Sequence, residues 1–161
     1  MTFRIERATE RDLALILRLI KDLAEYEKMA DVVAATEATL RESLFEKRAA
    51  EVIIGYAGDE PAGFALYFQS FSTFLGVPGL YLEDIFVSPK FRRHGLGQAL
   101  LVELAKIAVD RGYGRVEWTV LDWNELAIGF YKKIGARSMD EWRLFRLSGD
   151  SIRELAGATS G

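Results

Sequence analysis

Residues 80–98 of the chain read LYLEDIFVSPKFRRHGLGQ. The run Leu80–Val87 is strongly apolar except for Glu83 and Asp84, and the Ser-Pro pair after it is typical of the end of a buried strand. From Gly95 onward, leucines and other apolar residues recur at helical spacing. Gly95 and Gly97 therefore open a helix that follows a buried strand.

Two glycines at a helix start suggest a site for an anion. They leave backbone N–H groups bare, and the positive end of the helix dipole lies behind them. Lys90, Arg92 and Arg93 add positive charge suited to a phosphate diester. The loop is predicted to cradle a pyrophosphate. A positively charged surface turn with glycines for tight packing is the alternative.

Two other nucleotide-binding loops fit less well. The Walker pattern G-x-x-x-x-G-K-[ST] does not occur in the chain. A dinucleotide fingerprint needs Gly or Ala where Leu100 stands, and it should follow the strand directly. Asp122, after the next strand, could still serve as the acid that binds a ribose. A dinucleotide-binding oxidoreductase therefore stays a distant alternative.

Working outward from the loop, hydrophobic periodicity predicts an alternation of strands and helices. The order is a strand at 3–6, a helix from Thr9 to Tyr26 or Glu27, a helix from Thr36, strands at 51–56, 63–69 and 80–87, a helix at 95–112, a strand at 116–121, a helix at 124–135, a strand at 142–147 and a short helix from Asp150. This order indicates one α+β domain over residues 1–161, with a mixed sheet that is antiparallel early and parallel late. The parallel step is a right-handed crossover, whose strand ends and helix start are the favoured place for a ligand.

Composition excludes several kinds of chemistry. The 161 residues include no Cys and one His, His94. A Cys nucleophile, a disulfide framework and a Cys/His zinc site are therefore excluded, no metal is expected, and a Ser-His-Asp triad could only use His94. Other acid–base chemistry must come from Asp, Glu, Tyr or Lys.

Charge and hydropathy bear on partners and location. The 21 Lys and Arg against 24 Asp and Glu give a formal net charge of −3, which argues against nucleic-acid binding. No targeting or membrane segment is visible, so we expect no membrane partner and a cytoplasmic protein.

The hexapeptide Arg92-x-x-Gly95-x-Gly97 resembles the R-x-x-G-x-G signature of the GNAT acyltransferases. Its place, after an apolar strand and at a helix start, strengthens the resemblance. The surrounding segments YLED at 81–84, DWNE at 122–125, FYK at 130–132 and WRLF at 142–145 are similar to the diamine acetyltransferase branch, which includes spermidine/spermine and thialysine acetyltransferases. The resemblance covers the chain from Ile5 to about Ala156.

The resemblance implies the GNAT acyl-CoA N-acyltransferase fold, a mostly antiparallel sheet with a splayed parallel strand pair and flanking helices. Acetyl-CoA lies in the cleft of that strand pair. The implied cofactor-binding residues are Ile85, Phe86 and Val87 for the pantetheine arm, Arg92, Arg93, His94, Gly95, Leu96, Gly97 and Gln98 around the pyrophosphate, and Asn124, Glu125, Leu126, Ala127 and Tyr131 in a second segment.

The resemblance also implies an acceptor site for an amine. Its residues are Tyr26, Glu27, Glu83, Glu117, Trp118 and Thr119. A primary amine has a pKa of about 10.4, so it must lose a proton before it attacks a thioester. Glu83, expected on the opposite strand face from Asp84, matches the family's base, and Tyr131 matches its general acid. The alternatives are that Glu83 forms an ion pair at a strand end and that the ring of Tyr131 packs in the core.

Two departures from the branch bear on the acceptor. The loop Ser70–Gly76 has no acid where the polyamine enzyme has one. Arg93-His94 replaces a variant of the loop that begins with Gly, which should matter little because the backbone does the cradling. We therefore predict an acetyl-CoA-dependent N-acetyltransferase that uses direct attack in a ternary complex. Its acceptor is a small primary amine, thialysine, lysine-like or a short diamine, with a polyamine less favoured.

The resemblance further implies a homodimer with 142–147 at its interface. A non-catalytic acyl-CoA-binding regulatory module is the alternative function.

Overall fold

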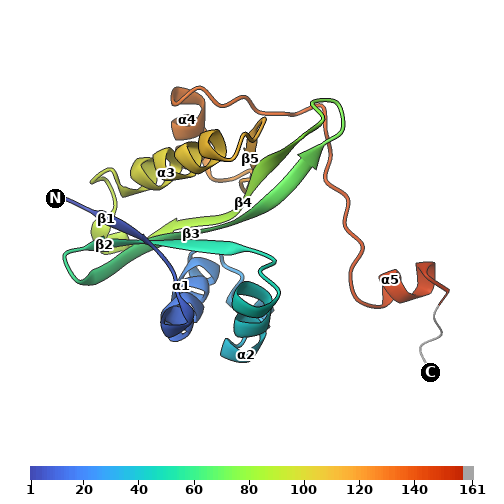
Figure 1. Ribbon diagram of the computed structural model, residues 1–161, viewed down its shortest axis with the longest axis horizontal. Helices are drawn as coiled ribbons and strands as arrows, with labels where there is room; N and C mark the ends of the chain where they lie inside the picture. The colour runs from blue at the N-terminus through green and yellow to red at the C-terminus, as the bar shows by residue number, and fades with distance from the viewer. Residues whose placement is uncertain (158–161) are drawn as a thin grey trace. The chain divides into compact units, whose positions relative to one another are not determined.

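The computed structural model describes residues 1–157, and the chain divides into two units, Met1–Thr119 and Val120–Gly161. A single domain over the whole chain stays a prediction. The first unit contains a five-stranded sheet in the order β1-β2-β3-β4-β5 (Figure 1). Its strands are β1 Arg4–Arg7, β2 Glu51–Ala57, β3 Glu60–Ser72, β4 Val77–Val87 and β5 Val116–Trp118. All pairs are antiparallel except β4–β5, so the predicted mixed sheet is confirmed.

Helices cover both faces of the sheet in the first unit. They are α1 Leu13–Tyr26, α2 Glu37–Leu40 and α3 Leu96–Asp110, with short helical turns at Glu10–Asp12, Ala30–Val32 and Pro89–Phe91 and a π-helical turn at Arg41–Glu46. The start of the first helix is held by a capping box, in which the Thr9 backbone N–H donates to Asp12 Oδ2 at 2.8 Å. The helix α3 connects β4 to β5, as the predicted crossover requires.

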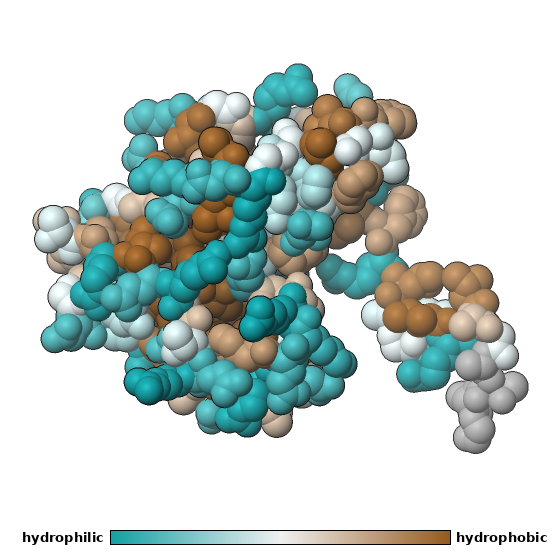
Figure 2. All heavy atoms as spheres, viewed as in Figure 1, coloured by the Kyte–Doolittle hydropathy of each residue, from teal (hydrophilic) through white to brown (hydrophobic). Residues whose placement is uncertain are grey.

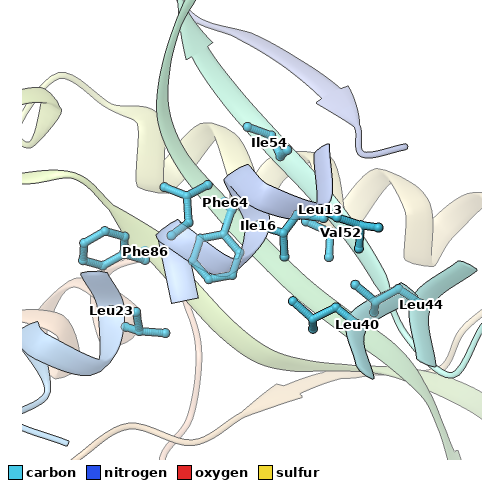
Figure 3. Close-up of a cluster of buried hydrophobic side chains, with 10 residues drawn as sticks. Leu13, Ile16, Leu23, Leu40, Leu44, Val52, Ile54, Phe64 and Phe86 are labelled. Atoms are coloured by element: carbon cyan, nitrogen blue, oxygen red, sulfur yellow. The ribbon is translucent and has the colours of Figure 1, made fainter. Parts of the chain in front are cut away.

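The helices α1 and α2 pack on one face of the sheet, and α3 packs on the other (Figure 1). Hydrophilic residues lie on the outward side of α1 and α2 (Figure 2). Their inward side meets the sheet in one apolar cluster (Figure 3), whose members include Leu13, Ile16, Leu23, Leu40, Leu44, Val52, Ile54, Phe64 and Phe86. The second cluster joins α3 to the sheet and includes Leu96, Leu100, Leu104, Tyr67, Leu80 and Leu82.

Two glycines let the start of α3 come close to the sheet. Gly55 and Gly63 face each other on β2 and β3, and Leu96 lies over both. A Cβ added at Gly55 would be 2.6 Å from Leu96 Cδ1, and one at Gly63 would be 2.4 Å from the carbonyl oxygen of Phe86. Because Leu96 is 1% exposed, this packing sets the height of the helix start above the strands.

A bulge in β4 changes which side chains face which helix. Leu82 pairs with Tyr67 and Asp84 pairs with Leu66, which leaves Glu83 as the extra residue. Tyr67 and Leu82 belong to the cluster under α3, whereas Leu66 packs in the cluster under α1. Asp84 therefore faces α1, although Leu82, two residues earlier, faces α3. Strict alternation fails at this bulge, and the expectation that Glu83 and Asp84 lie on opposite faces stays a prediction.

Beyond the bulge, β4 runs on without β5. The parallel pairs are Leu80 with Val116 and Leu82 with Trp118, and β5 then ends while β4 continues to Val87. The strand predicted at 116–121 is therefore shorter than expected. The residues of β4 from Ile85 to Val87 keep β3 as a partner on one edge only, which agrees with the splayed pair that the resemblance implies.

The second unit contains α4 Glu125–Lys133 and α5 Asp150–Leu155. The strand predicted at 142–147 is wrong for this chain, because these residues pair with none of the five strands in the described part. Their side chains are exposed, with Trp142 at 74% and Phe145 at 89%. A strand forms only where a partner accepts its hydrogen bonds. In residues 1–157 no helix is long and apolar enough to span a bilayer.

Candidate active site

The start of α3 has the features of an anion site. Its N-cap, Gly95, has a φ of +90° and makes no side-chain capping bond. The first-turn amides, from Leu96 to Gln98, have no carbonyl partner within a helix. A Cβ added at Gly97 would meet only Val87 Cγ2 at 3.9 Å among the described atoms, so packing does not require glycine here. Bare amides beside an unfilled space fit the pyrophosphate of acetyl-CoA.

The three cations predicted for this loop have different surroundings. Lys90 Nζ forms an ion pair with Glu60, at 2.9 Å from Oε2. Arg92 turns toward the protein. Arg93 and His94 are exposed, and Arg93 has a φ of +66°. That conformation favours glycine, which explains physically why a glycine suits this position of the motif.

The Arg92 side chain connects three parts of the first unit. Its Nε donates a hydrogen bond to the carbonyl oxygen of Val87 at 2.8 Å. Its guanidinium carbon lies 4.4 Å from the ring centroid of Tyr26 and 5.5 Å from that of Phe86. The loop before α3 is thus joined to the end of β4 and to the last residue of α1.

Three carboxyl groups lie near one another at the bulge of β4 and the end of α1. Glu27 follows the end of α1, and Glu83 and Asp84 lie at the bulge. Burial raises the pKa of Asp84, and the negative charges of Glu83 and Glu27 add to that effect, so that it reaches about 6. Burial also raises the pKa of Glu27. An acceptor substrate that is positively charged or donates a proton would stabilise an ionised carboxylate in this group.

The predicted acceptor residues on β5 lie next to this group in the sheet. Trp118 pairs with Leu82, the residue before Glu83, and Glu117 pairs with Tyr81. Glu117 also forms an ion pair with Arg115, at 3.0 Å between Oε1 and Nε. Thr119 comes directly after the strand. The first unit therefore places the predicted acceptor residues of β4 and β5 on adjacent strands.

The remaining predicted residues lie in the second unit, on and before α4. The Asn124 side chain caps this helix, with its Oδ1 accepting from the Ala127 N–H at 3.2 Å. Leu126 is 81% exposed, and the ring of Tyr131 lies 5.8 Å from that of Phe130. The roles expected for Asn124–Ala127 and Tyr131 stay predictions.

Asp84 is the residue of this site that the predicted set leaves out. The sequence does indicate it, because the alternation of apolar residues shifts by one position along the strand. Leu80 and Leu82 are apolar at even positions, whereas Ile85 and Val87 continue the same face at odd positions. A face that shifts by one residue across two acids is the pattern of a bulge.

Comparison with known proteins gives relatives over nearly the whole chain. Residues 16–136 match the Acetyltransferase (GNAT) family. A thialysine N-epsilon-acetyltransferase of Bos taurus is 40% identical, with 95% of this chain and 96% of the relative covered. An L-ornithine N5-acetyltransferase of Arabidopsis thaliana is 33% identical, with 96% and 88% covered. A solved integron cassette protein from the mobile metagenome of V. cholerae has a TM-score of 0.81 at 32% identity, with 98% and 99% covered.

The sheet with its parallel β4–β5 pair, the glycine loop at α3 and these matches define the class of protein. The chain belongs to the Acetyltransferase (GNAT) family, whose members use acetyl-CoA. Within that family its relatives match the diamine acetyltransferase branch, and the chain is an N-acetyltransferase. The resemblance predicted from its motifs is confirmed.

Proposed function

We propose that this enzyme transfers the acetyl group of acetyl-CoA to a primary amine of a small molecule by direct attack in a ternary complex. The observation that carries the proposal is the arrangement of β4 within the first unit. One end of the strand leads into the bare amides of α3, and its bulge presents Glu83 and Asp84 beside Glu27. An anion site and an acidic site therefore lie along one strand.

Each group of this chain has a distinct task in the proposed reaction. Acetyl-CoA supplies the acetyl group as an activated thioester. The amides from Leu96 to Gln98 bind its pyrophosphate. Glu83 accepts a proton from the ammonium through a water, because only the neutral amine is a nucleophile. Tyr131 gives a proton to the departing sulfur, as the family resemblance implies.

The acceptor proposed is thialysine, a lysine-like amine or a short diamine. The support comes from the names of the relatives, which act on thialysine and ornithine. Both names describe amino acids with a side-chain amine. The exposed tip of the β3–β4 hairpin, from Thr73 to Gly76, carries no acid that could hold a distant second ammonium. A polyamine is therefore a weaker candidate.

The decisive experiment is a turnover screen with acetyl-CoA and a panel of amines. The panel contains thialysine, lysine, ornithine, putrescine, spermidine and spermine, and release of the CoA thiol is followed. We expect the highest kcat/KM with an amine of the first four. Binding of CoA without turnover of any amine would favour the non-catalytic regulatory module instead.

We also propose that two copies associate through the segment 142–147. It is rich in apolar residues that one chain leaves exposed, with Trp142 and Leu144 both at 74% and Leu147 at 56%. A segment with strand-like composition gains its missing hydrogen bonds when it pairs with a second copy. Sedimentation equilibrium should give the mass of a dimer, and the monomer mass alone would refute this assembly.

A further inference from the structure

The contacts of Arg92 differ from those of a simple phosphate ligand. Its Nε–H is used by the Val87 carbonyl, and its guanidinium lies over the Tyr26 ring at 4.4 Å. A guanidinium can do both at once, because it donates in its plane and stacks with its face. An ammonium has no such plane, so lysine could not make the same two contacts.

The two rings under Arg92 are held to different degrees. Phe86 is 5% exposed and belongs to the cluster under α1, so its position is fixed by the core. Tyr26 is 39% exposed and is the last residue of α1. The rings are 6.4 Å apart and tilted by 52°. Contacts with Arg92 and Phe86 thus help to orient the half-exposed Tyr26 at the helix end.

We propose that Arg92 is a positioning residue that couples acetyl-CoA binding to the acceptor site. This inference rests on the proposed function. When the loop before α3 holds the pyrophosphate, Arg92 keeps Tyr26, and with it Glu27, in place for the amine. The coupling is reciprocal, because binding free energies are linked. A change at Tyr26 should thus weaken the binding of CoA at the loop.

The test is a double-mutant cycle read out by the Kd of CoA, measured by calorimetry without acceptor. Tyr26→Leu removes the ring, Arg92→Lys keeps the charge but loses the stack, and the double variant carries both. We expect each single variant to weaken CoA binding by about threefold to thirtyfold, the range of a single contact of this kind. The double variant should be weaker than Arg92→Lys by less than twofold, because both changes break the same link.

Matched variants separate coupling from general damage. Tyr26→Phe keeps the ring and should retain the CoA affinity that Tyr26→Leu loses. Tyr56→Leu breaks a similar pair, in which the Arg4 guanidinium lies 4.9 Å from the Tyr56 ring, and should leave the Kd of CoA within twofold. The KM of the acceptor should rise in Arg92→Lys more than kcat falls, which a purely structural role would not produce.

The outcomes distinguish this inference from the proposed function. If the unmodified protein binds no CoA, the proposed function fails and the coupling fails with it. If it binds CoA but the two changes are additive, or Tyr26→Leu leaves the Kd within twofold, only the coupling is overturned. Tyr26 lies at an exposed helix end, so its variants should fold even if an Arg92 variant does not. The Kd of CoA for Tyr26→Leu alone then decides whether the coupling exists.

Discussion

Leu82 and Asp84 are two residues apart on β4, yet their side chains lie on opposite faces of the sheet, that of Leu82 toward α3 and that of Asp84 toward α1. The pairing of Leu82 with Tyr67 and of Asp84 with Leu66 forces this arrangement, because it leaves Glu83 as the bulged residue. The bulge thereby brings Asp84 to the face of α1, where its pKa reaches about 6, first through burial and then through the charges of Glu83 and Glu27.

Asp84→Asn should make the protein more stable at high pH and not at low pH. A folded pKa of about 6 exceeds the ordinary value of 3.8, so the folded state holds this proton more tightly than the unfolded state. Stability therefore falls as pH rises from about 4 to about 6, and the loss amounts to roughly 3 kcal/mol. In urea unfolding, Asp84→Asn should therefore raise the free energy of unfolding by about that amount near pH 8 and by almost nothing near pH 4. Asp59→Asn, in an exposed turn, is the control, and equal gains at both pH values would contradict the assignment.

Glu83→Gln should lower kcat by about 100- to 10,000-fold, the usual contribution of a positioned acid or base. Activity should partly recover at high pH, because more of the acceptor amine, with a pKa of about 10.4, is then already neutral. Steady-state rates across pH check this, with Glu46→Gln on the exposed end of a helical turn as the control. Unchanged kcat and pH profile would remove Glu83 from the mechanism.

Tyr131→Phe should lower kcat by a similar factor and leave the affinity for CoA nearly intact. The ring stays, and only the hydroxyl proton for the departing sulfur is lost. Calorimetry gives the affinity and steady-state kinetics gives kcat. A variant that loses CoA binding and keeps kcat would make Tyr131 a binding residue and not the acid.

Gly97→Ala should separate ligand binding from folding. The new methyl group meets only Val87 Cγ2 at 3.9 Å, so the fold accepts it, and Ala gains about 0.5–1 kcal/mol over Gly in a helix. The same methyl group fills the space needed by the pyrophosphate, so CoA affinity should fall at least about tenfold, or 1.4 kcal/mol. Melting temperatures with and without CoA measure both effects. Lys106→Ala, on an exposed turn of the same helix, should change neither, and a Gly97→Ala protein with full CoA affinity would show that the cradle lies elsewhere.

Thr73→Asp should shift acceptor preference toward spermidine. The structure favours Thr73 for this change, because Ser72 is 5% exposed and its hydroxyl accepts the Leu75 N–H at 3.2 Å, so a carboxylate there would be buried. A well-placed charge pair contributes about 1–3 kcal/mol, or roughly 5- to 150-fold in kcat/KM. Competition between thialysine and spermidine measures the shift. If the unmodified enzyme already prefers spermine by about tenfold, other acids hold the polyamine, and Asp140 and Glu141 are the next to test.

The order of elements in the first unit follows from the sequence. Local signals suffice there, because a capping box at Thr9, apolar periodicity along α3 and a Ser-Pro stop after β4 each act within a few residues. The segment 142–147 shows the limit of such signals. Its alternation suits a strand, but a strand also needs a partner, and the five strands of the described chain provide none.

By itself, the sequence determined the chemistry of the loop, since the spacing of Arg92, Gly95 and Gly97 identifies a helix start that can bind an anion. The tertiary structure alone decided where the neighbouring side chains point. Whether Asp84 faces α1 or α3 depends on how β4 pairs with β3, and whether Arg92 meets phosphate or Tyr26 depends on where α1 ends against the sheet. Both are contacts between segments distant along the chain, and no local pattern of residues specifies the register or the distance at which two such segments pack.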